Sequence, residues 1–424
     1  MERRRASLTA FGLALFTLAC TSTKPSPTLT TPAPAITIAT RLADGDRRLR
    51  IGVLLPSTGS GGSLSQPLQR AIDLAVDEIN KAGGVWGKPV DVVRFDEGQD
   101  VATASTALEQ MMGENPVDAM IGPASSRVAL GIRDFVATVA LPACSPLATA
   151  AALSSPADNG FMFRTIPSDR LQAIAIATVI DQTGAKSPAM IYADDDYGRV
   201  FADGIRAELT RRGLPVVAAV AFDTTAKDYR DVAARVFTGS SPDALAVIGA
   251  GEPGARMLAT LRATGLNKAN TQVNDGLRKV GETSLGSANP TWLDRVQGVA
   301  PQASGHNPEW QKRFAAATGG ANDTFAAYAY DCVNLIALAA LSSNSESPAK
   351  LAASVISVSK SGVKCITFED CSEQLRLGRN IDLDGASGRL DLNDAGDPDG
   401  GSFDTFGFDA SGRDVQRRDE ITVG

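Results

Sequence analysis

Histidine is almost absent from this sequence of 424 residues, since His306 is the only one. A single imidazole argues against a histidine-based metal site, and a Ser-His-Asp triad would depend on that one residue. The nucleophile motif G-x-S-x-G is missing as well. Acidic residues outnumber basic ones, 48 to 41, which gives a formal net charge of −7. Because phosphate binding requires a basic face, nucleic acid is not an expected partner, and the composition favours binding over catalysis.

Long hydrophobic runs are scarce, and the one candidate is a short N-terminal segment. Three arginines at 3–5 precede an apolar stretch over 8–19, which is shorter than the ~20 residues of a transmembrane helix. The stretch ends at Cys20 in a pattern that resembles a bacterial lipobox, although Thr17 stands where a large apolar residue is usual. We therefore expect residues 1–20 to be a lipoprotein signal peptide whose lipidated Cys20 anchors the chain to the outer side of the cell membrane. Plain secretion is the alternative.

The C-x-x-C pattern of metal and redox sites is also absent. Of the four cysteines after the lipobox, Cys365 and Cys371 are six residues apart, which suits a local disulfide loop. This pairing leaves Cys144 and Cys332 as the second bond. Export to an oxidising compartment favours these bonds over the alternative of four buried free thiols.

The remaining sequence consists of a tether and a folded body. Residues 21–47 are rich in Thr, Pro and Ser and bury little, so we expect an extended linker. From residue 48 onward, apolar strands alternate with amphipathic helices. Strands are expected at 49–55, 90–95, 117–121, 141–144, 189–193, 216–222 and 244–248. Helices are expected at 68–79, 101–112, 128–139, 171–180, 200–211, 229–237, 255–264 and 328–341.

This alternation predicts an α/β fold with parallel central sheets that helices cover on both faces. One sheet of such length would be very wide, so we expect two lobes. Breaks that contain proline, at 164–169 and 298–302, suit crossings from one lobe to the other.

Three segments resemble loops that bind cofactors or metals. The motif G-x-G-x-x-G over 249–254 lies between a strand and a helix, with Asp275 about 20 residues on, as in dinucleotide-binding proteins. Its late position in the chain and the export signal instead favour a glycine-rich turn at the mouth of a cleft. Segment 83–89 lacks the spacing of a P-loop, and 391–402 lacks the acidic residue that ends a calcium loop. We therefore expect no cofactor and no metal.

Several further motifs follow one another in a characteristic order. They are Arg50-Ile-Gly-Val-Leu-Leu-Pro56, Ala71-Ile-Asp-Leu-Ala-Val-Asp-Glu-Ile-Asn80-Lys-Ala-Gly-Gly84, Ile121-Gly-Pro-Ala-Ser-Ser126, Cys144-Ser-Pro146, Phe163-Arg-Thr165, Asp194-Asp-Asp-Tyr-Gly198, Tyr328-Ala-Tyr-Asp331 and Gly385-Ala-Ser-Gly388-Arg-Leu-Asp391. Behind a lipobox and a tether, this order resembles the leucine/isoleucine/valine-binding family of type I periplasmic binding proteins, which serve ABC importers.

The resemblance implies two Rossmann-like lobes joined by three crossings, with the ligand held in the cleft between them. On this basis we assign 48–167 and 299–400 to lobe 1. Lobe 2 then comprises 168–298 and 401–424.

The resemblance also implies a ligand site. The positions that match the family's ligand contacts are Ser126, Leu147, Ala148, Thr149, Tyr197 and Asp275. Ser126 would offer its hydroxyl and the free N–H groups of a helix start to a carboxylate. Asp275 would hold an α-ammonium, and Tyr197 would form a flat wall. In the alternative interpretation, Ser126 caps its helix, Asp275 shapes a turn and Tyr197 covers a sheet edge.

Two positions depart from the family's pattern. Leu64 and Gly251 stand where family members carry aromatic residues over the ligand, which implies a roomier cavity. Tyr330, or alternatively Tyr328, would supply an aromatic ring from the helix expected at 328–341.

Together these features predict an extracytoplasmic solute-binding lipoprotein that is not an enzyme. We expect a monomer that captures an amino acid of the branched-chain type, or a similar small polar metabolite, and delivers it to ABC permease subunits by closure of its lobes. The alternatives are a ligand-sensing receptor component with the same fold and an NAD-dependent enzyme.

Overall fold

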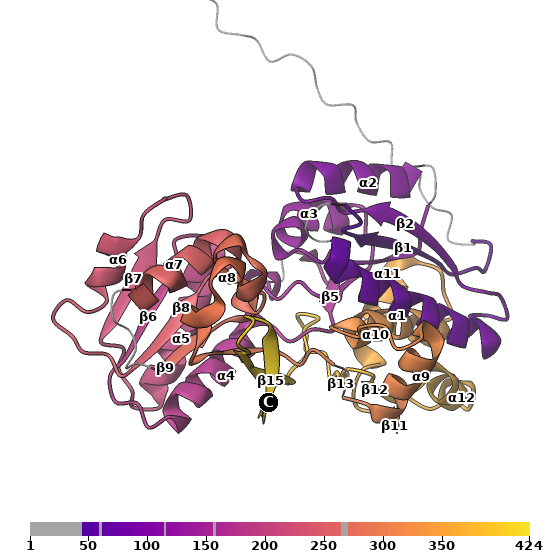
Figure 1. The fold of residues 1–424 in the computed structure, drawn as a ribbon. Helices are drawn as coiled ribbons and strands as arrows, with labels where there is room; N and C mark the ends of the chain where they lie inside the picture. The colour runs from indigo at the N-terminus through magenta and orange to yellow at the C-terminus, as the bar shows by residue number, and fades with distance from the viewer. Residues whose placement is uncertain (1–44, 59–61, 114–115, 156–157, 264–269, 305) are drawn as a thin grey trace, which may run out of the picture. The chain divides into compact units, whose positions relative to one another are not determined.

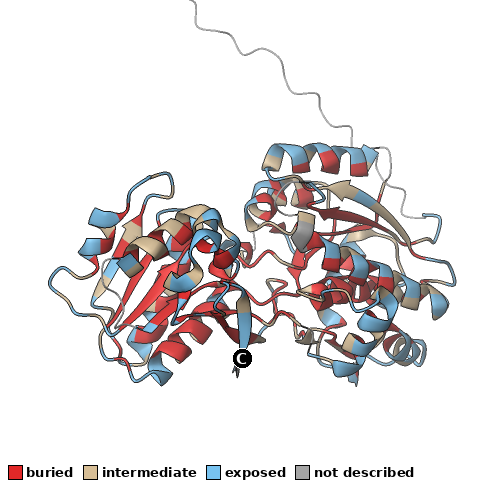
Figure 2. Cartoon of the chain, viewed as in Figure 1, coloured by how far each residue is buried: buried red, intermediate tan, exposed pale blue. Residues whose placement is uncertain are grey.

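The structure is a computed structural model that describes residues 45–58, 62–113, 116–155, 158–263, 270–304 and 306–424. The expected signal peptide, Cys20 and nearly all of the tether lie outside these residues. The described chain forms two main sheets, each flanked by helices (Figure 1). The strands are largely buried, whereas the outer faces of the helices are exposed (Figure 2).

The first sheet has five strands in the order β2-β1-β3-β4-β5, and all of its pairs are parallel. Its strands are β1 (Arg50–Leu55), β2 (Asp91–Asp96), β3 (Ala119–Ile121), β4 (Ala143–Ser145) and β5 (Met162–Arg164). The helices in this part are α1 (Gly62–Lys81), α2 (Val101–Gly113) and α3 (Ser126–Thr138). Two separate apolar clusters involve this sheet, one with α2 and α3 and one with α1, as expected for a parallel sheet that is buried on both faces.

The second sheet has seven strands in the order β15-β14-β10-β9-β8-β6-β7. Its strands are β6 (Pro188–Ala193), β7 (Ala218–Phe222), β8 (Ala244–Ile248), β9 (Asn270–Val273), β10 (Val296–Pro301), β14 (Gly401–Phe408) and β15 (Asp414–Val423). Its helices are α4 (Asp169–Gln182), α5 (Asp196–Arg211), α6 (Arg230–Arg235), α7 (Gly251–Ala263) and α8 (Ser284–Ala288). The strands from β6 to β10 pair in parallel, and β14 and β15 join antiparallel at one edge.

A third group of elements extends the part of the chain that contains the first sheet. It consists of α9 (Pro308–Thr318), α10 (Ala326–Ser343), α11 (Pro348–Ser357), α12 (Phe368–Arg376), β11 (Val363–Cys365), β12 (Ile381–Gly385) and β13 (Gly388–Arg389). Helix α10 is long and apolar enough to span a membrane by length and composition, which the sequence analysis did not anticipate. Most of it is buried among α1, α11, α12 and the first sheet, so its apolar character is that of a core helix.

The described chain passes between the two main sheets three times. It does so between β5 and α4, between β10 and α9, and before β14. The crossing expected at 298–302 lies at the end of that range, because β10 continues to Pro301 and pairs there with β14. Residues 299–301 therefore lie in the seven-stranded sheet, three residues beyond the expected boundary of lobe 2.

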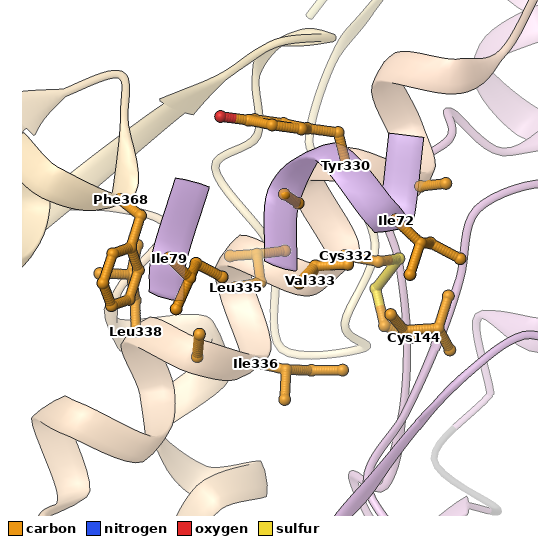
Figure 3. Packing of buried hydrophobic residues seen from close by; sticks show 14 of the residues in the cluster. Ile72, Ile79, Cys144, Tyr330, Cys332, Val333, Leu335, Ile336, Leu338 and Phe368 are labelled. Carbon is orange, nitrogen blue, oxygen red and sulfur yellow. A yellow bond between two sulfur atoms is a disulfide. The ribbon is translucent and has the colours of Figure 1, made fainter. Parts of the chain in front are cut away.

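Both expected disulfides are confirmed. Cys144 on β4 is bonded to Cys332 on α10, with 5.6 Å between their Cα atoms (Figure 3). Cys365 and Cys371 are bonded across 5.3 Å and link β11 to α12. The first bond ties the sheet to its core helix across 188 residues of sequence.

Candidate functional site

The predicted site residues follow the carboxyl ends of parallel strands. Ser126 comes after β3, and Thr149 after β4. Tyr197 follows β6 and Asp275 follows β9, both in the second sheet. Because the carboxyl ends of parallel strands meet at one edge of a sheet, each sheet gathers its own candidates at a single edge, which is where α/β proteins bind ligands.

Asp275 lies at the centre of a hydrogen-bonded cluster in the second sheet. It opens a 3₁₀ turn after Asn274, and its Oδ1 accepts hydrogen bonds from Gln172 Nε2 at 3.1 Å and from the Tyr197 hydroxyl at 3.4 Å. Asn274 Nδ2 donates to the Tyr197 oxygen at 2.8 Å. Burial, and next the negative charge of Asp275, raise the pKa of Tyr197, which keeps this phenol protonated. The structure thus brings Tyr197 and Asp275 together.

A second carboxylate, Asp169, belongs to the same cluster, and the sequence analysis missed it. Asp169 is buried at the first turn of α4, and its Oδ1 has no hydrogen-bond partner within the described chain. Gln172, one turn further along α4, has a similarly unpartnered Oε1. Burial and then the charge of Asp275 raise the pKa of Asp169, and burial also raises the pKa of Asp275. Without a cation, two carboxyls in this position hold a proton.

Residues at the edge of the first sheet meet this cluster through Thr149. Its carbonyl accepts the Asp169 N–H at 2.8 Å, and its side chain lowers the pKa of the Asp169 carboxyl, against the larger effect of burial. Ser126 does not cap α3, because the N-cap is Ser125, whose side chain accepts from the backbone N–H of Val128. The Ser126 hydroxyl oxygen instead accepts the Ala150 N–H at 3.1 Å and retains its own proton for donation.

Fewer backbone donors are free here than the resemblance implied. Glu97 accepts the N–H groups of Ala124 and Ser125. The N–H of Ala148 bonds Ser145 Oγ at 2.9 Å, and Ala148 is fully buried, so it contributes no donor to a ligand. Leu147 is only partly buried and packs against the core cluster of α1 and α10.

Arg164 holds the segment after β4 in place. This guanidinium is 1% exposed, and its Nη1 donates to the carbonyl oxygens of Ala148 at 3.2 Å and Ala150 at 3.0 Å. Its Nε donates to Asp397 Oδ1 at 2.6 Å, on the segment that leads to β14. Because all of these partners belong to the protein, Arg164 positions the loop and does not face a ligand.

Tyr330 packs in the core cluster of α1 and α10 rather than beside Asp275 (Figure 3). Its ring is buried against Trp310, and its hydroxyl donates to Glu78 on α1. Because α10 is apolar all round, periodicity could not identify the face that each tyrosine occupies. The alternative, Tyr328, donates to the carbonyl oxygen of Gln302 at 3.1 Å at a crossing between the sheets.

The two positions that lack aromatic residues both lie in the first turn of a helix. Leu64 lies in the first turn of α1, and its side chain is outside the described structure. Gly251 is exposed at the start of α7 with a φ of 54°, a left-handed conformation that disfavours a side chain. An aromatic residue at 251 would therefore be strained in this backbone.

The glycine motif over 249–254 has a structural explanation. A Cβ on Gly254 would come within 2.7 Å of Leu277, so glycine permits close packing of α7 on the turn of Asp275. The Gly249 N–H donates to Asn274 Oδ1 at 3.0 Å. The motif thus supports the turn that carries Asp275.

Comparisons with known proteins agree with this arrangement. A family model described as periplasmic binding protein matches residues 48–370. A chemotactic signal transduction system substrate-binding protein, BasB of Halobacterium salinarum, is 29% identical over 82% of this chain and 84% of its own length. The Leu/Ile/Val-binding protein BraC3 of Rhizobium johnstonii is 28% identical over 49% of this chain and 56% of its own length.

Solved structures give the same fold. The leucine-bound ABC transporter substrate-binding protein of Desulfitobacterium hafniense is 20% identical, with a TM-score of 0.68 over 87% of this chain and all of its own. The isoleucine complex of LivJ from Streptococcus pneumoniae has a TM-score of 0.65 at 20% identity, over 89% of this chain and 99% of its own. The chain therefore belongs to the periplasmic binding protein family, with the type I fold of its Leu/Ile/Val-binding members.

Proposed function

We propose that this protein captures a small solute with a primary ammonium group, an amino acid of the branched-chain type or a similar polar metabolite, outside the cytoplasm. The observation that carries the proposal is the pair of carboxyls at Asp169 and Asp275. A buried acceptor without a donor is costly, and both Asp169 Oδ1 and Gln172 Oε1 are in that state. An ammonium group offers three N–H donors and a positive charge to these atoms.

The opposite end of an amino acid would meet Ser126 and Thr149. The N–H of Ser126 lies in the first turn of α3, where backbone donors have no partner inside the helix. The Ser126 hydroxyl adds a second donor. A zwitterion that bridges Asp275 and Ser126 would stabilise the closed arrangement of the lobes, because only that arrangement brings both sets of contacts to one ligand.

Delivery to ABC permease subunits is the role we propose for the closed form, and the protein makes or breaks no bond. The names of the leucine and isoleucine complexes, both of them transporter substrate-binding proteins, support a transport role. We further propose that the protein is a monomer held at the outer side of the cell membrane by a lipid on Cys20. With the boundary moved to the end of β10, the division into lobes at 48–167 with 302–400, and 168–301 with 401–424, belongs to the same proposal.

A sensory role is the second candidate, and one observation favours it. The relative that matches over most of both chains, BasB, is by name a substrate-binding protein of a chemotactic system. Deletion of the gene in its native host separates the roles: loss of solute uptake supports transport, and loss of taxis with normal uptake supports sensing.

Binding itself is tested by a thermal-shift screen of amino acids, amino alcohols, amides and organic acids, followed by calorimetry. Ligand that binds only the folded state raises the melting temperature. Asp275→Asn should weaken binding of an ammonium ligand by ~30-fold or more, because a desolvated ammonium then loses its charge partner. Asp294→Asn, which removes an exposed charge from the same part of the chain, is the matched control. Equal affinity of Asp275→Asn and wild type would contradict the proposed ammonium site.

A further inference from the structure

We propose that residues 302–303 form the pivot on which the two lobes close, and that Tyr328 is a positioning residue that holds this pivot without touching the ligand. The inference rests on the proposed function, because it concerns the lobe closure proposed there. It gives Tyr328 a part in the affinity for every ligand, which differs from the role of an aromatic ring placed over one ligand.

The N–H groups of the pivot are bonded to the seven-stranded sheet. β10 ends at Pro301, and the pivot follows it directly. The N–H of Gln302 donates to the carbonyl oxygen of Ser402 at 3.0 Å. The N–H of Ala303 donates to Asp404 Oδ2 at 2.9 Å. Both acceptors belong to β14, so the pivot is fixed to the sheet that the chain leaves at this point.

The carbonyl groups of the same two residues are bonded to the start of α10, the core helix beside the first sheet. The Gln302 oxygen accepts the Tyr328 hydroxyl at 3.1 Å. The Ala303 oxygen accepts the N–H of Phe325 at 2.7 Å. Phe325 has a φ of 59°, a left-handed conformation that persists only where surrounding contacts enforce it. Each residue of the pivot thus donates to β14 and accepts from the start of α10.

The first turn of α10 also holds the segments of the other two crossings. The Tyr328 carbonyl accepts the Thr165 hydroxyl at 2.8 Å, directly after β5. Asp331 accepts the N–H groups of Ala386 at 2.7 Å and Ser387 at 2.8 Å, on the turn that precedes the third crossing. When one lobe rotates against the other, atoms near the axis move least, so hydrogen bonds to both lobes can persist only there. These bonds therefore locate the axis beside the first turn of α10.

The Tyr328 hydroxyl is suited to a permanent contact with the pivot. Tyr328 is only 4% exposed. Burial, and next the charge of Asp404, raise the pKa of Tyr328, so the phenol keeps its proton. A phenol has one O–H donor, and this donor is bonded to the Gln302 carbonyl. Tyr328 therefore has no donor left for a ligand, and its hydroxyl acts on binding through the pivot alone.

Loss of this hydroxyl should loosen the hinge. Tyr328→Phe would leave the Gln302 carbonyl without its side-chain donor, so the open form would sample a wider range of hinge angles. Closure must then order a more variable open form, which disfavours the closed form. This cost does not depend on what the ligand is. It should weaken the binding of every ligand by the same factor, about 2- to 10-fold, which is the effect of one hydrogen bond of ordinary net strength.

The test compares two tyrosines of one helix in the full chain. Calorimetry gives the Kd values of three probes, L-leucine, L-phenylalanine and L-leucinol, and small-angle X-ray scattering gives the radius of gyration of the ligand-free protein. Tyr330→Phe is the matched control, because it removes a buried hydroxyl of α10 whose partner, Glu78, lies on α1 and not at a crossing. Thr165→Val, which removes the bond to the Tyr328 carbonyl, is a second variant with the same expected direction.

In Tyr328→Phe, the Kd should rise by one common factor for each probe that binds, and the ligand-free radius of gyration should exceed that of wild type. Tyr330→Phe should match wild type in both measurements. Unchanged Kd values overturn the inference and leave the proposed function intact. A factor that differs between probes also overturns it, because Tyr328 would then contact the ligand. If Tyr328→Phe does not fold, Thr165→Val decides by the same criteria. Absence of binding by all three probes contradicts the proposed function, and the scattering comparison still decides the inference.

Discussion

Removal of the Arg164 guanidinium should severely destabilise the protein. Arg164→Met would leave Asp397 as an unpaired buried carboxylate and would remove the donor to the carbonyls of Ala148 and Ala150. Removal of one partner of a buried ion pair lowers the free energy of unfolding by about 3–5 kcal/mol. Since domains are stable by only ~5–15 kcal/mol, the loss is a large fraction of the total.

Urea denaturation followed by circular dichroism measures this loss. In the double variant Arg164→Met with Asp397→Asn, no uncompensated buried charge remains. The loss in free energy of unfolding should therefore be smaller than the sum of the losses in the two single variants by about 0.5–3 kcal/mol. Arg199→Met, which breaks only exposed ion pairs with Asp194 and Asp196, should change stability little. A loss below ~1 kcal/mol for Arg164→Met, or strict additivity in the double variant, would refute the reasoning.

Three further predictions follow from buried groups. Tyr330→Phe should lower the free energy of unfolding by about 1.5–3 kcal/mol, because its hydrogen bond to the Glu78 carboxylate is lost, and it should leave the ligand Kd unchanged. Weaker ligand binding in calorimetry would instead indicate that Tyr330 belongs to the ligand site. Replacement of Cys144 and Cys332 by alanine should lower the free energy of unfolding by about 5 kcal/mol, because the disulfide closes a loop of 188 residues and so limits the entropy of the unfolded chain. A change near zero in urea denaturation would contradict this argument. An amino alcohol such as L-leucinol should release protons when it binds and should bind more tightly as the pH rises. The reason is that the raised pKa values of the Asp169 and Asp275 carboxyls fall when an ammonium binds. Calorimetry in two buffers of different ionisation enthalpy that shows no proton release would exclude this coupling.

Much of the fold could be predicted because its central strands are short, continuous apolar runs. The strands expected at 244–248 and 189–193 agree with β8 and β6, since buried parallel strands are apolar on both faces. The later strands escaped detection because they are short or mixed in polarity. β13 has only two residues, and β15 carries an unbroken run of polar and charged residues over 416–420.

The site was predicted less completely than the fold. Tyr197 and Asp275 lie together because both follow strands of one parallel sheet. Asp169 was overlooked since its segment was interpreted only as a crossing, although an acidic residue two places after Pro167, at the start of an expected helix, is a detectable signal. The two hydrogen bonds that Glu97 accepts come from backbone N–H groups 27 and 28 residues further along the chain, and no local sequence pattern predicts such contacts.

The structure of a complex tests the central claim most directly. A ligand identified by the thermal-shift screen should be crystallised with the protein at pH 7. The account predicts a ligand nitrogen within hydrogen-bond distance of both Asp169 Oδ1 and Asp275, with the opposite end of the ligand toward Ser126. A ligand that binds elsewhere, or that places a carboxylate or an apolar group between the two acids, would contradict it.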